Sequence, residues 1–333
     1  MSAAVSSARS PARRPTGPAQ RLLGNGAVIV AIIYVVLFVI FAATQSDALS
    51  VTGVTDLFNN ALPLALAAAG GTLVVLTRGF DLSVAGVIAL TNVLMATQLP
   101  DGPAGALLGV AIAAGTGLVV GAVNGWLVAY MNLQSIASTL ATMIVCSGLA
   151  LLVLDAPGGN VPDAITYGMT DTVAGVVPVA ALVALAVVLV WLALRRTNWG
   201  VSLYAVGADE TAAALAGIAT QRVKFLAYCV AGIFYGLAGF MLSGLTATGN
   251  PNGGNSYLLL MFAAIAIGGT SFSGGRGGMV ASMIGAATLT LLQKVLFSAG
   301  VSSFYTGIFQ GIVMILAVLI GAATARLAKG RRS

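Results

Sequence analysis

The chain has 333 residues, of which 59% are hydrophobic and only 7% are charged, and its formal net charge is +6. Soluble domains carry roughly a quarter of charged residues, so this composition excludes a soluble enzyme or a soluble binding module. The apolar stretches are nearly continuous and lack the alternation that is typical of membrane β-barrel strands. The composition therefore predicts an all-α, polytopic membrane protein.

About ten apolar segments long enough to cross a membrane follow one another. In chain order they cover residues 27–43, 57–77, 82–99, 104–130, 136–154, 173–194, 223–246, 257–272, 279–297 and 304–327. The first segment has no clear cleavage site, which indicates a retained span and not a signal peptide. The break at 268–278 is also compatible with a re-entrant turn. We expect a transmembrane domain over residues 27–327, between a disordered basic cytoplasmic tail at 1–26 and a basic C-terminal tail at 328–333.

The charged residues test this number of spans. With the N-terminus inside, ten spans place every Lys and Arg except Lys294 on the inner side, and the net positive charge then reports membrane topology, not nucleic-acid binding. The outer side collects Asp47, Asp56, Asp101, Asp155, Asp163 and Asp171. Nine spans, or the reverse orientation, would mix the two sets. The pattern therefore predicts that both termini are cytoplasmic.

A hydrophilic segment at 197–222 separates two apolar spans. Within it, Asp209 and Glu210 suit the positive end of a helix dipole, alanines follow, and Gly217 can end the helix. These residues predict a short helix over 209–217 on the basic side of the membrane, where a soluble partner could contact the protein. An ordinary amphipathic helix at the membrane interface is the alternative.

Two glycine-containing motifs mark breaks between spans. The first, RGFDLSVAGVIAL, starts at Arg78 and predicts either a structured break lining a polar route, or a tight turn in which Asp81 caps the next helix and pairs with Arg78. The second, GGTSFSGGRG at 268–277, shares GGT and a later Arg-Gly with GGTLVVLTRG at 70–79. An internal duplication is one hypothesis, and chance is its rival in a chain with 42 glycines.

Uncharged polar side chains lie inside the predicted spans. Amides and hydroxyls suit hydrogen bonding to a neutral hydroxylated solute. The candidate residues of a translocation path are Asn59, Asn60, Asn92, Asn124, Ser138, Thr139 and Thr142, and Gln134 and Gln293 belong to the same class. For each residue alone, a hydrogen bond between helices is the alternative. Proton or sodium coupling usually needs buried carboxylates, and the spans offer none near their middle.

Several chemistries lack their residues in this chain. The Gly-rich stretch ending at Arg276 has no Lys-Ser/Thr pair after it, so it is not a phosphate-binding loop of the Walker type. There is no histidine, and Cys146 and Cys229 have no partner motif for a disulfide or a metal site. We therefore expect no catalytic site, no metal and no cofactor bound by this chain, and any ATP energy must come from a partner.

Four stretches together resemble the membrane permeases of bacterial ABC importers, in particular their ribose-type carbohydrate branch. They are GFDLSVAGVIAL (79–90), NGWLVAYMNLQSIASTLATMIVCSGLALLV (124–153), TNWGVSLYAVGADETAAALAGI (197–218) and AIAIGGTSFSGGRGGMVASMIGA (264–286). The resemblance implies a multi-pass permease of the cytoplasmic (inner) membrane that dimerises with itself or a related chain. It also implies cytoplasmic ATPase subunits that use ATP and Mg, and an extracytoplasmic binding protein that delivers a sugar.

The same resemblance gives the polar segment a role. It implies that the ATPase docks on a coupling helix, with Asp209, Glu210, Ala212, Ala213 and Gly217 as the coupling residues. Thr211 stands where the Glu of the family's motif would be, and Glu210 lies one place earlier. The alternatives are an ABC permease for branched-chain amino acids or nucleosides, and an ion-coupled secondary transporter.

Overall fold

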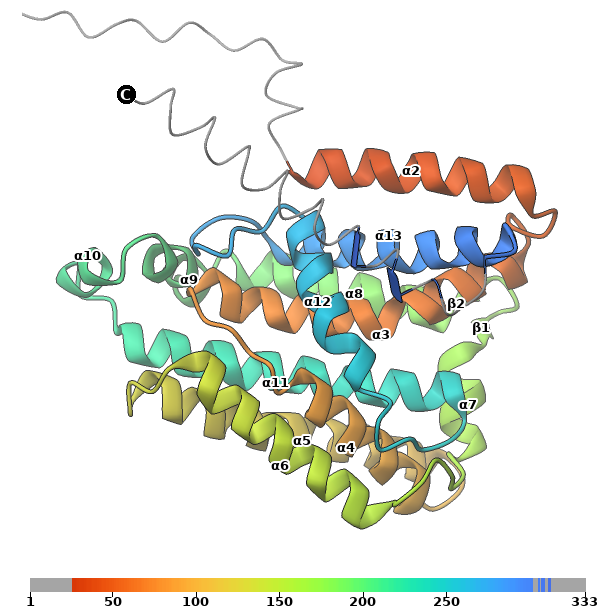
Figure 1. The fold of residues 1–333 in the computed structure, drawn as a ribbon, viewed down its shortest axis with the longest axis horizontal. Helices are drawn as coiled ribbons and strands as arrows, with labels where there is room; N and C mark the ends of the chain where they lie inside the picture. The colour runs from red at the N-terminus through yellow and green to blue at the C-terminus, as the bar shows by residue number, and fades with distance from the viewer. Residues whose placement is uncertain (1–25, 302–304, 306, 309–310, 313–333) are drawn as a thin grey trace, which may run out of the picture.

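A computed structural model describes residues 26–301 and, beyond them, residues 305, 307–308 and 311–312. Over this range the protein is a bundle of α-helices whose long members run side by side (Figure 1). Six described helices are long and apolar enough to span a membrane: α2 (Gly26–Thr44), α3 (Val51–Leu76), α5 (Pro103–Ala129), α6 (Ser135–Val153), α11 (Thr220–Thr246) and α13 (Met279–Ser298). The predicted all-α, polytopic architecture is confirmed. The predicted tails, apart from Gly26, and most of the predicted last span lie outside the described residues.

Shorter elements complete the described part of the chain. Two apolar helices, α4 (Val84–Thr97) and α12 (Asn255–Ile267), have only 14 and 13 residues. The helix α8 (Val179–Leu194) is bent by 78° from α9 (Asn198–Ala208). The remaining elements are α7 (Asp163–Thr170), β1 (Thr172–Val173), β2 (Val177–Pro178) and α10 (Glu210–Leu215).

The span predicted at 173–194 begins later than expected. Its first residues form an antiparallel hairpin in which Val173 pairs with Val177, and the turn uses positive φ angles at Ala174 (54°) and Gly175 (70°). Pro178 then precedes the first helical residue and cannot donate a backbone hydrogen bond. The apolar residues before Pro178 were therefore wrongly predicted as helix.

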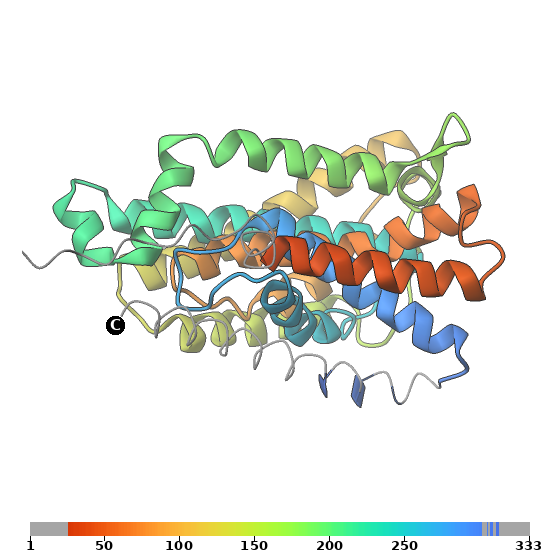
Figure 2. The ribbon, with the colours of Figure 1, turned by 90° about the horizontal axis from the view of Figure 1, so that it is seen from above.

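The helix α3 lies in the interior of the bundle. In the apolar 18-residue stretch of α3, 94% of the stretch is buried, whereas only 11% of the corresponding stretch of α2 is buried. It contacts α8, α11, α12 and α13, and α8 and α6 lie on opposite sides of it in the view from above (Figure 2). Small residues allow this crowding: a Cβ added to Gly70 would lie 2.8 Å from the carbonyl oxygen of Ala231 on α11.

The predicted separation of charge is found at the two ends of the bundle. One end, called here the α10 end, contains α9, α10 and the loops 77–83 and 271–277. The opposite end, called here the hairpin end, contains the loop 45–50, the beginning of α3, the β1–β2 hairpin, α7 and the loops 98–102, 154–161 and 247–254. The six Asp residues predicted for one side are all exposed and belong to segments of the hairpin end. The described basic residues other than Lys294 belong to segments of the α10 end.

The helices α5 and α11 make the most extensive contact in the bundle. Their backbones nearly touch because glycines face each other. A Cβ added to Gly117 would lie 1.9 Å from the carbonyl oxygen of Gly232, and one added to Gly236 would lie 1.9 Å from that of Ala113. Gly121 continues the same four-residue spacing on α5. Small residues at this spacing are the usual means of close helix packing in membranes.

We expect Gly117→Leu to destabilise the bundle by about 1–3 kcal/mol, because the larger side chain must force two backbones apart. Gly115→Leu on the same helix is the matched control, since a Cβ at Gly115 meets no atom within 4 Å. The measurement is the apparent Tm of each purified variant in one detergent. Equal Tm values for the two variants would contradict this account of the α5–α11 contact.

Candidate functional site

The predicted short helix in the polar segment is confirmed as α10. Asp209 is its N-cap, and the Asp209 carboxylate accepts a hydrogen bond from the amide of Ala212 at 2.9 Å. Gly217 follows the helix with φ 82°, and the amide of Ile218 donates to the carbonyl of Ala213. This is the left-handed C-terminal stop that the sequence predicted.

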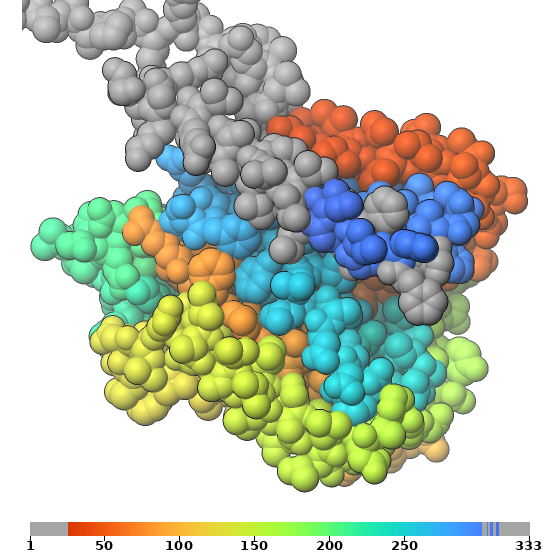
Figure 3. All heavy atoms as spheres, viewed as in Figure 1, coloured from red at the N-terminus to blue at the C-terminus, as the bar shows by residue number. Residues whose placement is uncertain are grey.

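The helix α10 has one face against the protein and one face in solvent. Ala213 is buried and Glu210 is half-buried, whereas Ala212 and Leu215 are exposed, Leu215 to 85%. In the space-filling view, the α9–α10 region protrudes from the rest of the molecule (Figure 3). The structure thus places a small helix with an apolar side chain at its tip beyond the end of the bundle.

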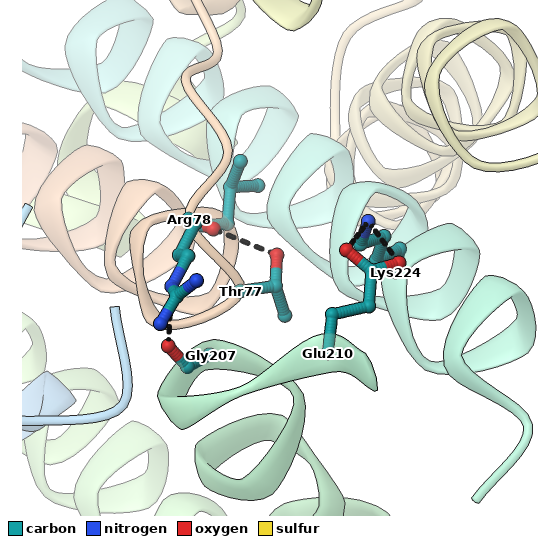
Figure 4. A network of polar contacts seen from close by, with 6 residues as sticks. Thr77, Arg78, Gly207, Glu210 and Lys224 are labelled. Atoms are coloured by element: carbon teal, nitrogen blue, oxygen red, sulfur yellow. Dashed lines mark hydrogen bonds and ion pairs between the residues drawn. The ribbon is translucent and has the colours of Figure 1, made fainter. Parts of the chain in front are cut away.

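Arg78 joins this protruding segment to two other parts of the chain. Its Nε donates hydrogen bonds to the carbonyl oxygens of Gly207 at 2.7 Å and Ser273 at 3.0 Å, and its Nη2 donates to the carbonyl of Ala208. Figure 4 shows the contact with Gly207. A guanidinium can bridge several acceptors because its five N–H groups are held in a fixed plane. Arg78 therefore connects the end of α3, the junction of α9 and α10, and the loop 271–277.

Backbone contacts reinforce this junction. The amide of Gly275 donates to the carbonyl of Leu76 at 3.0 Å, and a Cβ at Gly207 would lie 1.7 Å from the same carbonyl oxygen. The glycines at 274, 275 and 277 all have positive φ, which is the conformation that residues with a side chain rarely adopt. The glycines of the second motif thus allow the backbone to turn sharply and to pack against the end of α3.

A single ion pair ties α10 to α11 within the described part of the chain. Lys224 Nζ lies 2.5 Å from the Glu210 carboxylate, and the two side chains are 21% and 46% exposed (Figure 4). Because both groups remain in contact with solvent, such a pair contributes about 0–1 kcal/mol. A cavity of about 250 Å3 lies between this pair and Arg78, with Tyr228 and Ser135 also in its wall.

The segment 77–83 between α3 and α4 is an irregular stretch of backbone inside the bundle. Side chains from α6 and α11 satisfy it: the amide of Phe80 donates to Ser135 Oγ at 3.2 Å, and the amide of Leu82 donates to Thr139 Oγ1 at 3.0 Å. Tyr228 Oη donates to the Phe80 carbonyl at 3.1 Å. This arrangement supports the structured break and not the tight turn.

The expected pairing of Arg78 with Asp81 is wrong. Asp81 is buried, and its Oδ1 accepts hydrogen bonds from the amide and the hydroxyl of Ser83 at 3.0 and 2.6 Å. Ser83, not Asp81, is the N-cap residue of α4. The guanidinium finds its partners among backbone carbonyls because the chain carries it out to the α10 end, away from the carboxylate.

Part of the predicted polar set forms one network around the irregular segment. Asn124 Nδ2 donates to Ser83 Oγ at 2.9 Å, and Thr142 Oγ1 donates to Asn124 Oδ1 at 2.7 Å. Thr139 accepts from Leu82, as described above, and the neighbouring Ser138 donates to the Gln134 carbonyl on its own helix. The contacts made by Asn124, Thr139 and Thr142 hold α5 and α6 to the start of α4.

The remaining predicted residues lie elsewhere. Asn92 contacts Ser243 and the loop after α11 at the hairpin end. Asn59 is buried and donates to the Thr170 carbonyl at 2.8 Å, whereas Asn60 is exposed and donates to the Asp56 carbonyl. The seven candidates therefore occupy three separate places and do not form one continuous row.

Sequence reasoning missed three residues of this site. Tyr228 is a single polar residue among apolar neighbours, and nothing in its spacing distinguishes it. Ser135 precedes Ser138 and Thr139 by three and four residues, and this helical spacing could have added it to the predicted polar set. Arg78 was noticed only as a partner for Asp81, although its place directly after α3 and before Gly79 could have indicated a role at the end of a span.

The fold and the site together define a multi-pass membrane transport protein with a solvent-exposed helix attached to irregular segments of its spans. The family profile described as "Branched-chain amino acid transport system / permease component" matches residues 53–318, and the chain belongs to this family. It is a multi-pass protein of the bacterial inner membrane.

Curated relatives cover most of the chain. The chain is similar to the ribose import permease protein RbsC of Bacillus subtilis (strain 168), with 36% identity over 86% of this chain and 89% of the relative. It is 31% identical to RbsC of Escherichia coli (strain K12), over 86% and 90% of the two chains. It is 28% identical to the galactose/methyl galactoside import permease protein MglC of the same strain, over 86% and 92%. No solved structure matches the chain.

We expect Arg78→Gln to loosen the α10 end while leaving the bundle folded. The variant loses charged hydrogen bonds worth about 1.5–3 kcal/mol each, so amide hydrogen exchange should speed up in 205–217 and 271–277. Arg222→Gln is the control, because the Arg222 side chain is exposed and makes no hydrogen bond or ion pair to any described residue. If the Arg78 variant shows wild-type exchange rates in these two segments, Arg78 does not hold them together.

Proposed function

We propose that this chain is the transmembrane permease subunit of an ABC importer for a monosaccharide or a similar small polar solute. Its family and its relatives, which are ribose and galactose import permeases, support this function. In this proposal a cytoplasmic partner hydrolyses ATP with Mg2+, and the permease itself catalyses no reaction. The observation that carries the proposal is α10, an exposed helix braced to the membrane domain by Arg78.

The contacts of α10 give a route by which a partner could move the spans. A displacement of α10 acts on Gly207 and Ala208, which Arg78 connects to the end of α3 and to Ser273. It also acts on Lys224 at the start of α11 through Glu210. Closure of the ATPases would thus shift the irregular segments 77–83 and 271–277 together. This movement would shift the equilibrium between inward-open and outward-open states, because the ATPase makes different contacts with the permease in the two states.

The proposed topology has ten spans with both termini in the cytoplasm. The six long helices supply six of these spans. The shorter helices α4, α8 and α12 supply three more spans. An irregular segment extends two of them, 77–83 before α4 and the loop with residues 271–277 after α12. Residues 304–327 supply the last span. The α10 end then faces the cytoplasm, in agreement with the concentration of Lys and Arg there.

The partners follow from this orientation. The ATPase docks on α10, with Asp209 and Gly217 shaping the helix and Glu210, Ala212 and Leu215 available for contact. An extracytoplasmic sugar-binding protein docks at the hairpin end. A second permease copy and membrane lipid cover the exposed apolar side chains of α2, α5, α6 and α8, which include Val35, Leu107 and Leu152.

The description of the family favours a second candidate, an ABC permease for branched-chain amino acids. Reconstitution with the ATPase and the binding protein separates the candidates. ATP-dependent uptake of ribose or galactose, but not of leucine, supports the sugar permease. Uptake that needs an ion gradient and persists without the ATPase would instead identify a secondary transporter.

Leu215→Gln should abolish ATP-dependent uptake and weaken co-purification of the ATPase, because it places a polar group at the apolar tip of α10. The permease should still insert and retain its Tm, since Leu215 is 85% exposed. Met131→Gln is the matched control, an exposed apolar residue between α5 and α6 at the same end. Normal uptake by the Leu215 variant would contradict the docking role of α10.

The orientation can be tested by cysteine labelling in intact cells. Both native cysteines are buried, so a membrane-impermeant maleimide should label Asp163→Cys at the hairpin end directly. It should label Gln221→Cys, an exposed position at the α10 end, only after the cells are permeabilised. The opposite pattern would reverse the proposed topology.

A further inference from the structure

A second cavity lies at the hairpin end, far from α10. Its volume is about 540 Å3, which falls in the roughly 300–1,000 Å3 range of small-molecule sites. The wall comes mainly from the loop between α11 and α12 and the first turn of α12, with contributions from Asn92 on α4 and Pro157. None of the contacts assigned above to ATPase coupling involves this cavity.

The loop that forms the cavity is held from several sides. The side chain of Asn92 donates to Ser243 Oγ and to the carbonyl of Thr248, and it accepts from the amide of Asn250 at 2.6 Å. Gly249 and Gly158 exchange two backbone hydrogen bonds of 2.9 Å. These contacts fix the loop before any solute arrives, so the cavity is preformed. They also use the polar groups of Asn92, which therefore shapes the cavity and does not bind its occupant.

The beginning of α12 is fixed in the same way. A Cβ at Gly254 would lie 1.9 Å from the carbonyl oxygen of Ala85, so α12 starts directly against the backbone of α4. The residues that follow, Asn255 to Tyr257, are thereby placed in the cavity wall. Their side chains project from a supported helix and not from a loose loop.

Four polar groups in this wall have no hydrogen-bond partner among the described residues. They are the side-chain amide nitrogens (Nδ2) of Asn250 and Asn252, the hydroxyl of Ser256 and the hydroxyl of Tyr257. Together they offer donors and acceptors around one space. The ring of Tyr257 and the side chain of Leu242 add apolar surface beside them.

The chemistry of the wall selects the class of occupant. The lining contains amides, hydroxyls and apolar groups and no Lys, Arg, Asp or Glu. A zwitterionic amino acid would lose hydration of two charges without an opposite charge to replace it. A neutral sugar can instead hydrogen-bond through its hydroxyls while its C–H face packs on the tyrosine ring.

We infer that this cavity is a sugar-binding site of the permease itself, in which Asn250, Asn252, Ser256 and Tyr257 receive the solute as it leaves the binding protein. The inference rests on the proposed function, since it assumes that a sugar is the transported solute. It adds that the permease contributes to selection through hydroxyl recognition and is not only a passive route.

The double variant Ser256→Ala with Tyr257→Phe tests the site with little risk to the fold. Both hydroxyls lack partners in the protein, so their removal leaves no buried group unsatisfied. Asn160→Ala is the control, because Asn160 is an exposed amide in the hairpin-end loop 154–161 and lies outside the cavity lining. The Tm of each purified protein should equal that of the wild type.

Binding is measured first on the permease alone in nanodiscs. In saturation-transfer NMR, D-ribose or D-galactose at millimolar concentration should give a signal with wild type and with Asn160→Ala, and the double variant should lose it. Leucine should give none. A sugar signal that is unchanged in the double variant, or a leucine signal that the double variant removes, would overturn the site.

Transport then separates this inference from the proposed function. With the ATPase and saturating sugar-loaded binding protein, the double variant should transport roughly tenfold less sugar per ATP hydrolysed, as expected when a site loses hydrogen bonds to substrate hydroxyls. If the wild type takes up sugar and the double variant transports as much sugar per ATP, the cavity site is refuted and the proposed function stands. Absence of ATP-dependent sugar uptake by the wild type refutes the proposed function and the inference with it.

Discussion

The structure depends on one constraint: backbone amides and carbonyls that leave helical geometry inside an apolar bundle must still find hydrogen-bond partners. The segment 77–83 breaks the helical path between α3 and α4, and Ser135, Thr139 and Tyr228 supply what its backbone lacks. These three side chains come from α6 and α11. The need to satisfy one irregular stretch therefore fixes the positions of the helices around it.

The same constraint gives Arg78 its importance. At the α10 end, the carbonyls of Gly207, Ala208 and Ser273 point to one place, and one guanidinium satisfies all three. A residue in this position makes separate parts of the chain mechanically dependent on each other. An exposed helix that is joined to both irregular segments is suited to transmit a push from outside the membrane. The cavity at the hairpin end is formed by a loop that Asn92 on α4 holds in place. The irregular segment 77–83 leads directly into the other end of α4, so this short helix connects the two ends of the protein.

The sequence predicted whatever depends on local chemistry. Hydropathy located the long spans, and Asp209 with Gly217 located α10 because a helix N-cap and a left-handed stop are encoded within a few residues. It failed where partners come from distant segments. The carboxylate of Asp81, three residues away, was the natural partner to expect for Arg78. The chain turns between these two residues, and the guanidinium instead binds the backbone carbonyls of residues 207, 208 and 273. The polar set Asn59 to Thr142 was expected to share one path, because sequence alone does not tell which polar residues of different helices meet. The β1–β2 hairpin was missed because its apolar residues continue the composition of the helix that follows.

The glycine-lined contact between α5 and α11 has a consequence for motion. Two helices whose backbones meet at Gly117 and Gly232 without side chains between them have no layer that can shear, so they translate and tilt as one rigid body. Lys224 lies near the beginning of α11, at one end of this pair. Any conformational cycle must therefore place its sliding surfaces elsewhere, between the α5–α11 pair and the neighbouring helices, and the pair sets the smallest unit that can move.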